Sequence, residues 1–116
     1  MGWYAWMPFM ECYHGVVSFG HELSGSLSLN GAALDLDGGH GYLEQDWGQA
    51  FPAGYVWVHS NHFTTPGVSL MGSVALIPWL RGQFRGLLIG LMTPRGLMRF
   101  ATYNGTKTPR LAIDAE

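Results

Sequence analysis

The chain has 116 residues and a formal net charge of −2, and only 12% of its residues are charged, about half the globular average of roughly 25%. This length predicts a single domain over residues 1–116 with a modest core. Lysine and arginine number 6 and form no basic run. Nucleic acid is therefore not expected as a partner, because phosphate binding needs clustered cations. The single cysteine, Cys12, excludes an intrachain disulfide and a CxxC metal or redox motif.

Apolar residues make up 47% of the chain and aromatic residues 14%, so a ligand cavity, a partner chain or a membrane surface must cover some of them. No basic segment precedes the first apolar residues, which argues against a signal peptide. The longest apolar stretch, residues 68–80, is interrupted by Gly72, Ser73 and Pro78. It is too short and too broken to predict a transmembrane span. We expect a cytoplasmic or membrane-peripheral protein.

The secondary-structure pattern is that of an all-β protein. Short runs of β-branched and aromatic residues alternate with turn signals, 17 glycines among them, and helical periodicity is almost absent. About eight antiparallel strands are expected, enough for a small barrel or a curved half-barrel. In chain order the extended segments are residues 3–19, 22–29, 32–36, 41–46, 55–63, 69–77, 84–92, 97–103 and 110–114.

Two connections carry specific local signals. The segment at 22–29 alternates leucine and serine, which predicts a half-buried strand with its serine face outward. Asn30-Gly31 follows and predicts a type I′ hairpin turn, because both residues tolerate positive φ. Residues 47–52, from Trp47 to Pro52, are expected to form a loop with at most one helical turn.

Two expected strands each present a face that combines aromatic and polar groups. In an extended conformation, side chains two residues apart share a face. Isolated polar groups among rings suit an amphipathic ligand, because the rings form an apolar wall and the polar groups fix one end of the ligand. The shared faces consist of Tyr42, Glu44 and Asp46 on the first strand, and Tyr55, Trp57, His59, Asn61 and Phe63 on the second.

Glu44 and Asp46 are the candidate catalytic residues. Burial beside aromatic walls raises the pKa of a carboxyl, and a neutral acid can protonate a substrate. The alternative is structural: Asp46 could accept backbone N–H bonds from the following loop, and Glu44 could face solvent. The pattern by itself leaves both interpretations open.

The histidine pattern predicts no metal site, and a zinc site assembled only in three dimensions is the alternative. His59 and His62 fall on opposite strand faces, and neither HxxxH nor HxH occurs. His14, beside Tyr13 and Glu11, is the best single candidate for a functional histidine, with a hydrogen-bonded structural histidine as the alternative. Cys12 is expected to be a small buried residue rather than a reactive thiol. The tryptophans fit either a ligand wall or a core or dimer interface.

The motifs resemble the bacterial branch of the tocopherol cyclase family over nearly all of the chain. The pattern Tyr-x-Glu-x-x-Trp-Gly, then Phe-Pro, then Trp-x-x-x-Asn-x-Phe carries the resemblance. It implies a calycin-like (lipocalin-like) β-barrel. It also implies closure of a chromanol ring by protonation of a prenyl double bond and addition of a phenol oxygen, with no cofactor. The corresponding positions are Tyr42, Glu44, Asp46, Trp47, Trp57, Asn61 and Phe63.

Two departures from the family pattern shape the expectations. Family members are longer, and the resemblance begins inside the first half of their architecture, which suggests a truncated member. Position 59 is histidine, where the family pattern has glutamine. An incomplete barrel leaves strand edges and an apolar face uncovered, so we expect a homodimer or higher homo-oligomer. Edge pairing or packing of Trp-rich faces would build it.

Three functions follow from these patterns. The preferred hypothesis is binding of a small hydrophobic or amphipathic, prenyl-lipid-like ligand, with Tyr42, Trp47, Trp57, His59, Asn61, Phe63 and His14 as contacts. A cofactor-independent cyclase using Glu44 and Asp46 is the first alternative. A non-catalytic oligomeric structural or interaction module is the second.

Overall fold

The computed structural model describes residues 2, 6–8, 10–108, 110 and 112. These residues form antiparallel strands and one short 3-10 helix, so the all-β prediction is confirmed. The elements are β1 (Cys12–Glu22), β2 (Ser26–Leu29), β3 (Ala32–Asp35), β4 (His40–Gly48), β5 (Tyr55–Ser60), β6 (Ser69–Trp79), β7 (Gly82–Thr93), β8 (Gly96–Ala101) and η2 (Thr102–Asn104).

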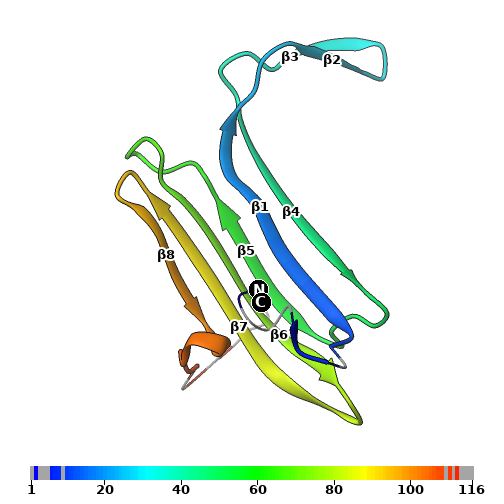
Figure 1. Cartoon of the computed structure of the whole chain (residues 1–116). Helices are drawn as coiled ribbons and strands as arrows, with labels where there is room; N and C mark the ends of the chain where they lie inside the picture. Colours follow the sequence, from blue (N-terminus) through cyan, green and yellow to red (C-terminus); the bar gives the residue numbers. More distant parts are fainter. Residues whose placement is uncertain (1, 3–5, 9, 109, 111, 113–116) are drawn as a thin grey trace.

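The strands form three separate sheets (Figure 1). β1 pairs with β4, and the β2–β3 hairpin is inserted between these two partners as a projecting two-stranded arm. β5, β6, β7 and β8 form a four-stranded antiparallel meander. Short connections between neighbouring strands account for the meander, since antiparallel partners can be joined by tight turns.

The three sheets are open and do not close into a barrel. No backbone ladder joins the β1–β4 pair to the four-stranded sheet among the described residues. An isolated backbone bridge, between Met10 before β1 and Trp79 of β6, joins the two units, and β1 lies over β6. The sequence predicted either a small barrel or a curved half-barrel. The chain does not form a closed barrel, because a barrel needs continuous strand pairing around its circumference.

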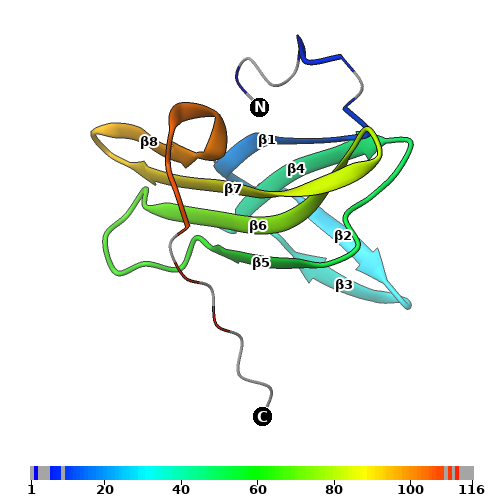
Figure 2. The same ribbon diagram turned by 90° about the horizontal axis from the view of Figure 1, so that it is seen from below.

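The small core lies where β1 faces the four-stranded sheet. Met71 and Ala75 on β6 and Cys12 on β1 are buried there. The Phe19 ring of β1 lies directly over Gly90 of β7, in the space that a Cβ would occupy. The absence of a side chain at position 90 thus lets β1 approach the four-stranded sheet closely. Figure 2 shows the β1–β4 pair and the four-stranded sheet from below.

Several element boundaries differ from the sequence prediction. β1 begins at Cys12 rather than at residue 3, although residues 3–5 and 9 lie outside the described part of the chain. β4 continues through Trp47 and Gly48, where a loop was predicted, because both residues pair with β1. β5 ends at Ser60 instead of Phe63. The strand expected at 110–114 falls mostly on residues outside the described set.

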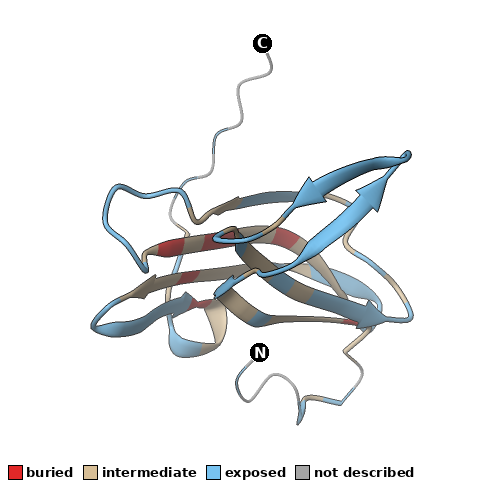
Figure 3. Cartoon of the chain, turned by 90° about the horizontal axis from the view of Figure 1, so that it is seen from above, coloured by how far each residue is buried: buried red, intermediate tan, exposed pale blue. Residues whose placement is uncertain are grey.

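The β2–β3 arm confirms one prediction and corrects another. Asn30 and Gly31 have φ values of 52° and 83°, as the predicted type I′ turn requires. The leucine face, however, is not half-buried: Leu27, Leu29 and Leu34 are 43%, 62% and 49% exposed. Figure 3 shows both strands of the arm coloured as exposed. The alternation predicted an amphipathic strand correctly, but no described part of the chain covers its apolar side.

Candidate functional site

β4 carries three of the predicted site residues on one face. Tyr42 Oη donates a hydrogen bond of 2.6 Å to Glu44 Oε2. Asp46 follows on the same face of the strand, because alternate residues of a strand point to the same side. The opposite strand, β1, pairs in a register that sets His14 directly across from Asp46. Strand pairing therefore brings a histidine into a group of carboxylates 30 or more residues away in sequence.

His14 lies between the two carboxylates. Its Nδ1 is 2.6 Å from Asp46 Oδ1, and its Nε2 is 3.8 Å from Glu44 Oε2. A carboxylate only accepts hydrogen bonds, so the short contact places a proton on Nδ1. In the neutral tautomer, Nε2 then carries the lone pair. Nε2 is buried and has no hydrogen-bond partner among the described atoms.

β5 adds two aromatic rings to this cluster from the neighbouring sheet. Trp57 Nε1 donates to Glu44 Oε2 over 3.1 Å. The His59 ring stacks on Tyr42, with centroids 3.8 Å apart. The predicted shared face of β5 therefore meets the predicted face of β4. We call the six residues the polar–aromatic cluster; its members are His14, Tyr42, Glu44, Asp46, Trp57 and His59.

The other three predicted ligand contacts lie elsewhere. Trp47 points to the opposite face of β4 from Glu44 and Asp46, and it stacks on Tyr13 with centroids 5.5 Å apart. Asn61 and Phe63 follow the end of β5 and line a separate cavity of about 930 Å³ beside the start of the β2–β3 arm. Asn61 Nδ2 donates to the His40 carbonyl over 3.5 Å. Alternation along an extended strand could not place Asn61 and Phe63, because the strand had already ended.

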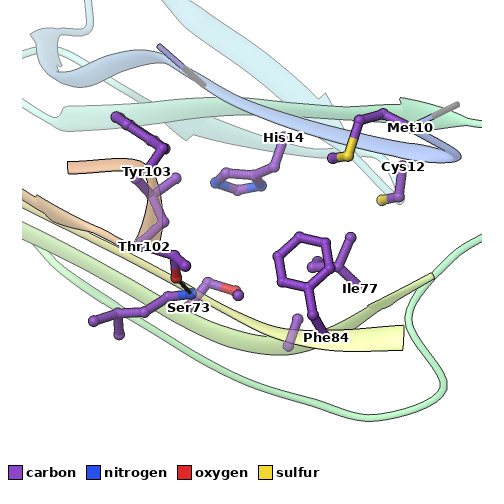
Figure 4. Close-up of a pocket in the computed structure, with 12 residues that line it drawn as sticks. Met10, Cys12, His14, Ser73, Ile77, Phe84, Thr102 and Tyr103 are labelled. Carbon is purple, nitrogen blue, oxygen red and sulfur yellow. Dashed lines mark hydrogen bonds between the residues drawn. The ribbon is translucent and has the colours of Figure 1, made fainter. Parts of the chain in front are cut away.

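Four members of the polar–aromatic cluster, His14, Glu44, Asp46 and Trp57, line a cleft between the two units. The cleft has a volume of about 510 Å³ and is walled on the β6 side by Ser73, Ala75 and Ile77. A smaller cavity of about 80 Å³ continues from His14 toward a mainly apolar end. Figure 4 shows this continuation; its far walls include Met10, Phe84, Leu88 and Tyr103.

Sequence reasoning did not identify the β6 and β7 residues of the cleft. Their strands are almost continuously apolar, a pattern typical of strands buried on both faces. Such a run gives no indication of which side chains face a cavity. Ser73, Ala75 and Ile77 share the face of β6 that lines the cleft. Alternation could not single out that face, because small and apolar residues occur on both faces of this strand.

Burial and neighbouring carboxylates raise the pKa of two groups in and beside the cleft, Tyr42 and Cys12. Burial chiefly raises the pKa of Tyr42 far above its ordinary value, and the hydrogen bond to Glu44 and the charges of Glu44 and Asp46 raise it further. The phenol therefore stays protonated and donates to Glu44. Burial, with a smaller effect of the Asp46 charge, also raises the pKa of the Cys12 thiol. This agrees with the expectation of an unreactive cysteine.

The cluster also contains a set of potential metal ligands, which the histidine spacing did not predict. Donor atoms of His14, Glu44 and Asp46 lie within 4.8 Å of one another. The 2.6 Å contact between His14 and Asp46 has the length of a charge-assisted hydrogen bond. That hydrogen bond uses His14 Nδ1 and one Asp46 oxygen, while His14 Nε2 has no hydrogen-bond partner among the described atoms.

The fold and the cleft define an open antiparallel β protein with a histidine–carboxylate cluster at one end of an apolar cavity. The tocopherol cyclase-like family matches residues 1–107 of the 116-residue chain, and the chain belongs to that family. No curated protein and no solved structure matches the chain. No helix among the described residues has the length and apolar character that crossing a membrane requires.

Proposed function

We propose that this protein binds a small amphipathic, prenyl-lipid-like ligand in the cleft. The observation that carries the proposal is the position of the polar–aromatic cluster at one end of an otherwise apolar cavity. The ligand's hydroxyl groups would contact His14 Nε2 and the carboxylates. Its apolar chain would lie along Ile77 and Phe84. A cavity of about 510 Å³ falls within the range of small-molecule sites, roughly 300–1,000 Å³.

Membership of the tocopherol cyclase-like family supports this ligand class. We further infer that the chain is a calycin-like (lipocalin-like) half-barrel. The β1–β4 pair and the four-stranded sheet line the cleft from two sides, as two parts of an incomplete barrel would. The open edges of both units are consistent with that interpretation.

Binding can be tested by titrating the protein with a prenylated hydroquinone and following tryptophan fluorescence, since Trp57 lines the cleft. Ala75→Leu would fill the cavity from β6 and should weaken binding about tenfold or more, because the added volume displaces the ligand. Val74→Leu is the matched control, because its side chain lies on the opposite face of the same strand. Equal affinities for the two variants would contradict binding in the cleft.

Acid-catalysed ring closure is a second candidate function, favoured by one specific observation. His14 contacts one carboxylate and faces another beside the apolar cavity. In this reaction Glu44 or Asp46 would first take up a proton and then transfer it to an alkene carbon of the prenyl chain. The phenol oxygen would then bond to the resulting carbocation, and the phenol proton would pass to His14 and back to the carboxylate. The reaction is an isomerisation, so no cofactor or co-substrate is consumed.

Turnover of a prenyl hydroquinone by Glu44→Gln and Asp46→Asn variants separates catalysis from binding. If the cluster supplies the acid, at least one variant should lose about 100-fold or more of the rate while still binding ligand. Glu22→Gln, an exposed carboxylate at the end of β1, is the control and should keep full activity. Full turnover by both cluster variants would rule out the acid role, and binding would remain the function. Failure of the wild-type protein to bind any prenyl ligand would favour a structural or interaction module.

A further inference from the structure

The β2–β3 arm presents an apolar face that the described part of the chain leaves exposed. Register places Leu27 opposite Leu34 and Leu29 opposite Ala32, so these four side chains share one face of the ribbon. The three leucines are among the exposed large apolar side chains. An isolated two-stranded hairpin is marginally stable in water, and a hydrophobic face needs a partner surface. The arm, residues 23–39, therefore lacks the contact that its amphipathic sequence implies.

The four-stranded sheet presents a second apolar surface, with several exposed side chains among the described residues. β1 packs on the face that carries Gly90, as the Phe19 ring shows. The opposite face, here called the outer face, runs through Val58, Gly72, Ile89 and Phe100, which are paired in one row across all four strands. A Cβ placed on Gly72 would touch Val58 and Ile89, which confirms their shared side. Neighbouring rows add Val56, Val74, Leu70, Leu91 and Met98.

The apolar rows of the outer face extend about 15 Å across the strands and about 13 Å along them, judged from strand spacing and rise. Val58, Met98 and Phe100 are 51%, 51% and 41% exposed. Antiparallel sheets with one solvent-facing side normally carry polar residues there. An apolar face of this extent indicates an interaction surface.

The two apolar surfaces carry charges of opposite sign, which indicates what each of them binds. Every acidic residue in the described part of the chain precedes residue 47, and every described lysine or arginine follows residue 80. The arm and its base carry Glu22, Asp35 and Asp37 and no cation. The outer face carries Arg85, which pairs with Leu76, and arginines occupy both turns that adjoin β7, Arg81 and Arg95. An acidic apolar arm and a basic apolar face are complementary in sign.

We propose that the leucine face of the β2–β3 arm docks on the outer face of a second copy of this chain. The contact is heterologous, because arm and outer face are different surfaces. The inference goes beyond the proposed ligand function and does not depend on it. An anionic membrane fits the outer face alone, but it would leave the leucines uncovered and repel the acidic arm. A second copy supplies a complementary partner for both surfaces.

Sedimentation equilibrium on the full chain tests the proposal. We expect association that increases with protein concentration and weakens at high salt, because opposite charges on the two surfaces are screened. The arm variant replaces Leu27, Leu29 and Leu34 by serine, and the face variant is Val58→Glu. Each variant alone should raise the dissociation constant about tenfold or more. Leu80→Asn is the control, because it removes an exposed leucine that belongs to neither surface. Leu80 has a positive φ, which asparagine tolerates.

Mixing the two variants gives the decisive measurement. The arm variant keeps an intact outer face, and the face variant keeps an intact arm, so an equimolar mixture should regain association that neither shows alone. A misfolded variant could not restore it. A monomeric wild-type protein, or a mixture that stays monomeric, would overturn the proposal. So would co-sedimentation with vesicles containing anionic phosphatidylglycerol that Val58→Glu abolishes and the arm variant leaves intact, because the membrane would then be the occupant.

Discussion

Glu44 Oε2 accepts hydrogen bonds from two aromatic donors, Tyr42 Oη and Trp57 Nε1, which come from different sheets. The same atom faces His14 Nε2 at 3.8 Å. A single carboxylate oxygen thus links the β1–β4 pair to β5. Each of its neighbours is held in one orientation by this contact, since hydrogen bonds to a charged acceptor are stronger than neutral ones.

Ionisation of Tyr42 provides a direct measurement of this cluster. Glu44→Gln removes a negative charge and the carboxylate acceptor, two of the causes that raise the pKa of Tyr42. We expect the pKa of Tyr42 to fall while staying above the ordinary tyrosine value, because burial, the largest cause, persists. An ultraviolet absorbance titration at alkaline pH, with Tyr42→Phe to assign the signal, measures the shift. An unchanged titration would show that Glu44 and Tyr42 do not interact in solution.

Cys12 gives a second prediction at the residue scale. Its pKa is raised in the folded state, first by burial and then by Asp46, so the folded protein holds the thiol proton more tightly than the unfolded chain does. The contribution to stability is complete below the thiol's ordinary pKa of roughly 8.5. It is lost as the pH rises through the higher folded-state value. Urea unfolding at neutral and alkaline pH should show this loss in the wild type, and Cys12→Ala should show a smaller one.

At the scale of the elements, close backbone contacts set the register of β1 with β4. Gly48 pairs with Cys12 at the end of the ladder. The Glu11 carbonyl accepts hydrogen bonds from Gln49 and Ala50 over 2.8 and 3.1 Å. These contacts hold the chain so near to β1 that position 48 has no room for a side chain. The glycine of the Trp-Gly motif therefore has a packing role, which positions Asp46 opposite His14.

Replacing Gly48 with alanine tests this role. The added Cβ would collide with the Glu11 carbonyl and the Cys12 Cα, so the strands would have to separate. We expect a loss of about 3 kcal/mol in the free energy of unfolding. Gly20→Ala on β1 is the matched control, because nothing lies within 4 Å of the position that its added Cβ would take. Denaturant unfolding would measure both; equal stability of the two variants would contradict a steric role for Gly48.

At the scale of the whole molecule, the cleft exists because two open units stand a short distance apart. On the β7 side, the Phe19 ring of β1 lies over Gly90. The polar–aromatic cluster joins them on the β5 side. The separation of the units, and with it the cleft volume, depends on these two contacts.

Gly90→Ala should therefore alter both stability and the cleft. The added methyl would occupy the position of the Phe19 ring and push β1 away from the sheet. Overpacking of this kind costs about 1–3 kcal/mol, and prenyl-ligand affinity should fall with it. Gly82→Ala, at the start of β7 with open space around it, should change neither. Calorimetry and the fluorescence titration check the two effects; unaltered affinity in Gly90→Ala would show that Phe19 does not control the cleft.

The sequence alone determined the local features of this protein. Strand positions, the Asn30-Gly31 turn and the shared face of Tyr42, Glu44 and Asp46 follow from alternation and turn chemistry, which act over a few residues. The tertiary structure alone decided that His14 meets Asp46, that Trp57 and His59 join them, and that the sheets stay open. Those outcomes depend on pairing and packing between segments far apart in the chain, and local periodicity carries no information about which segments meet.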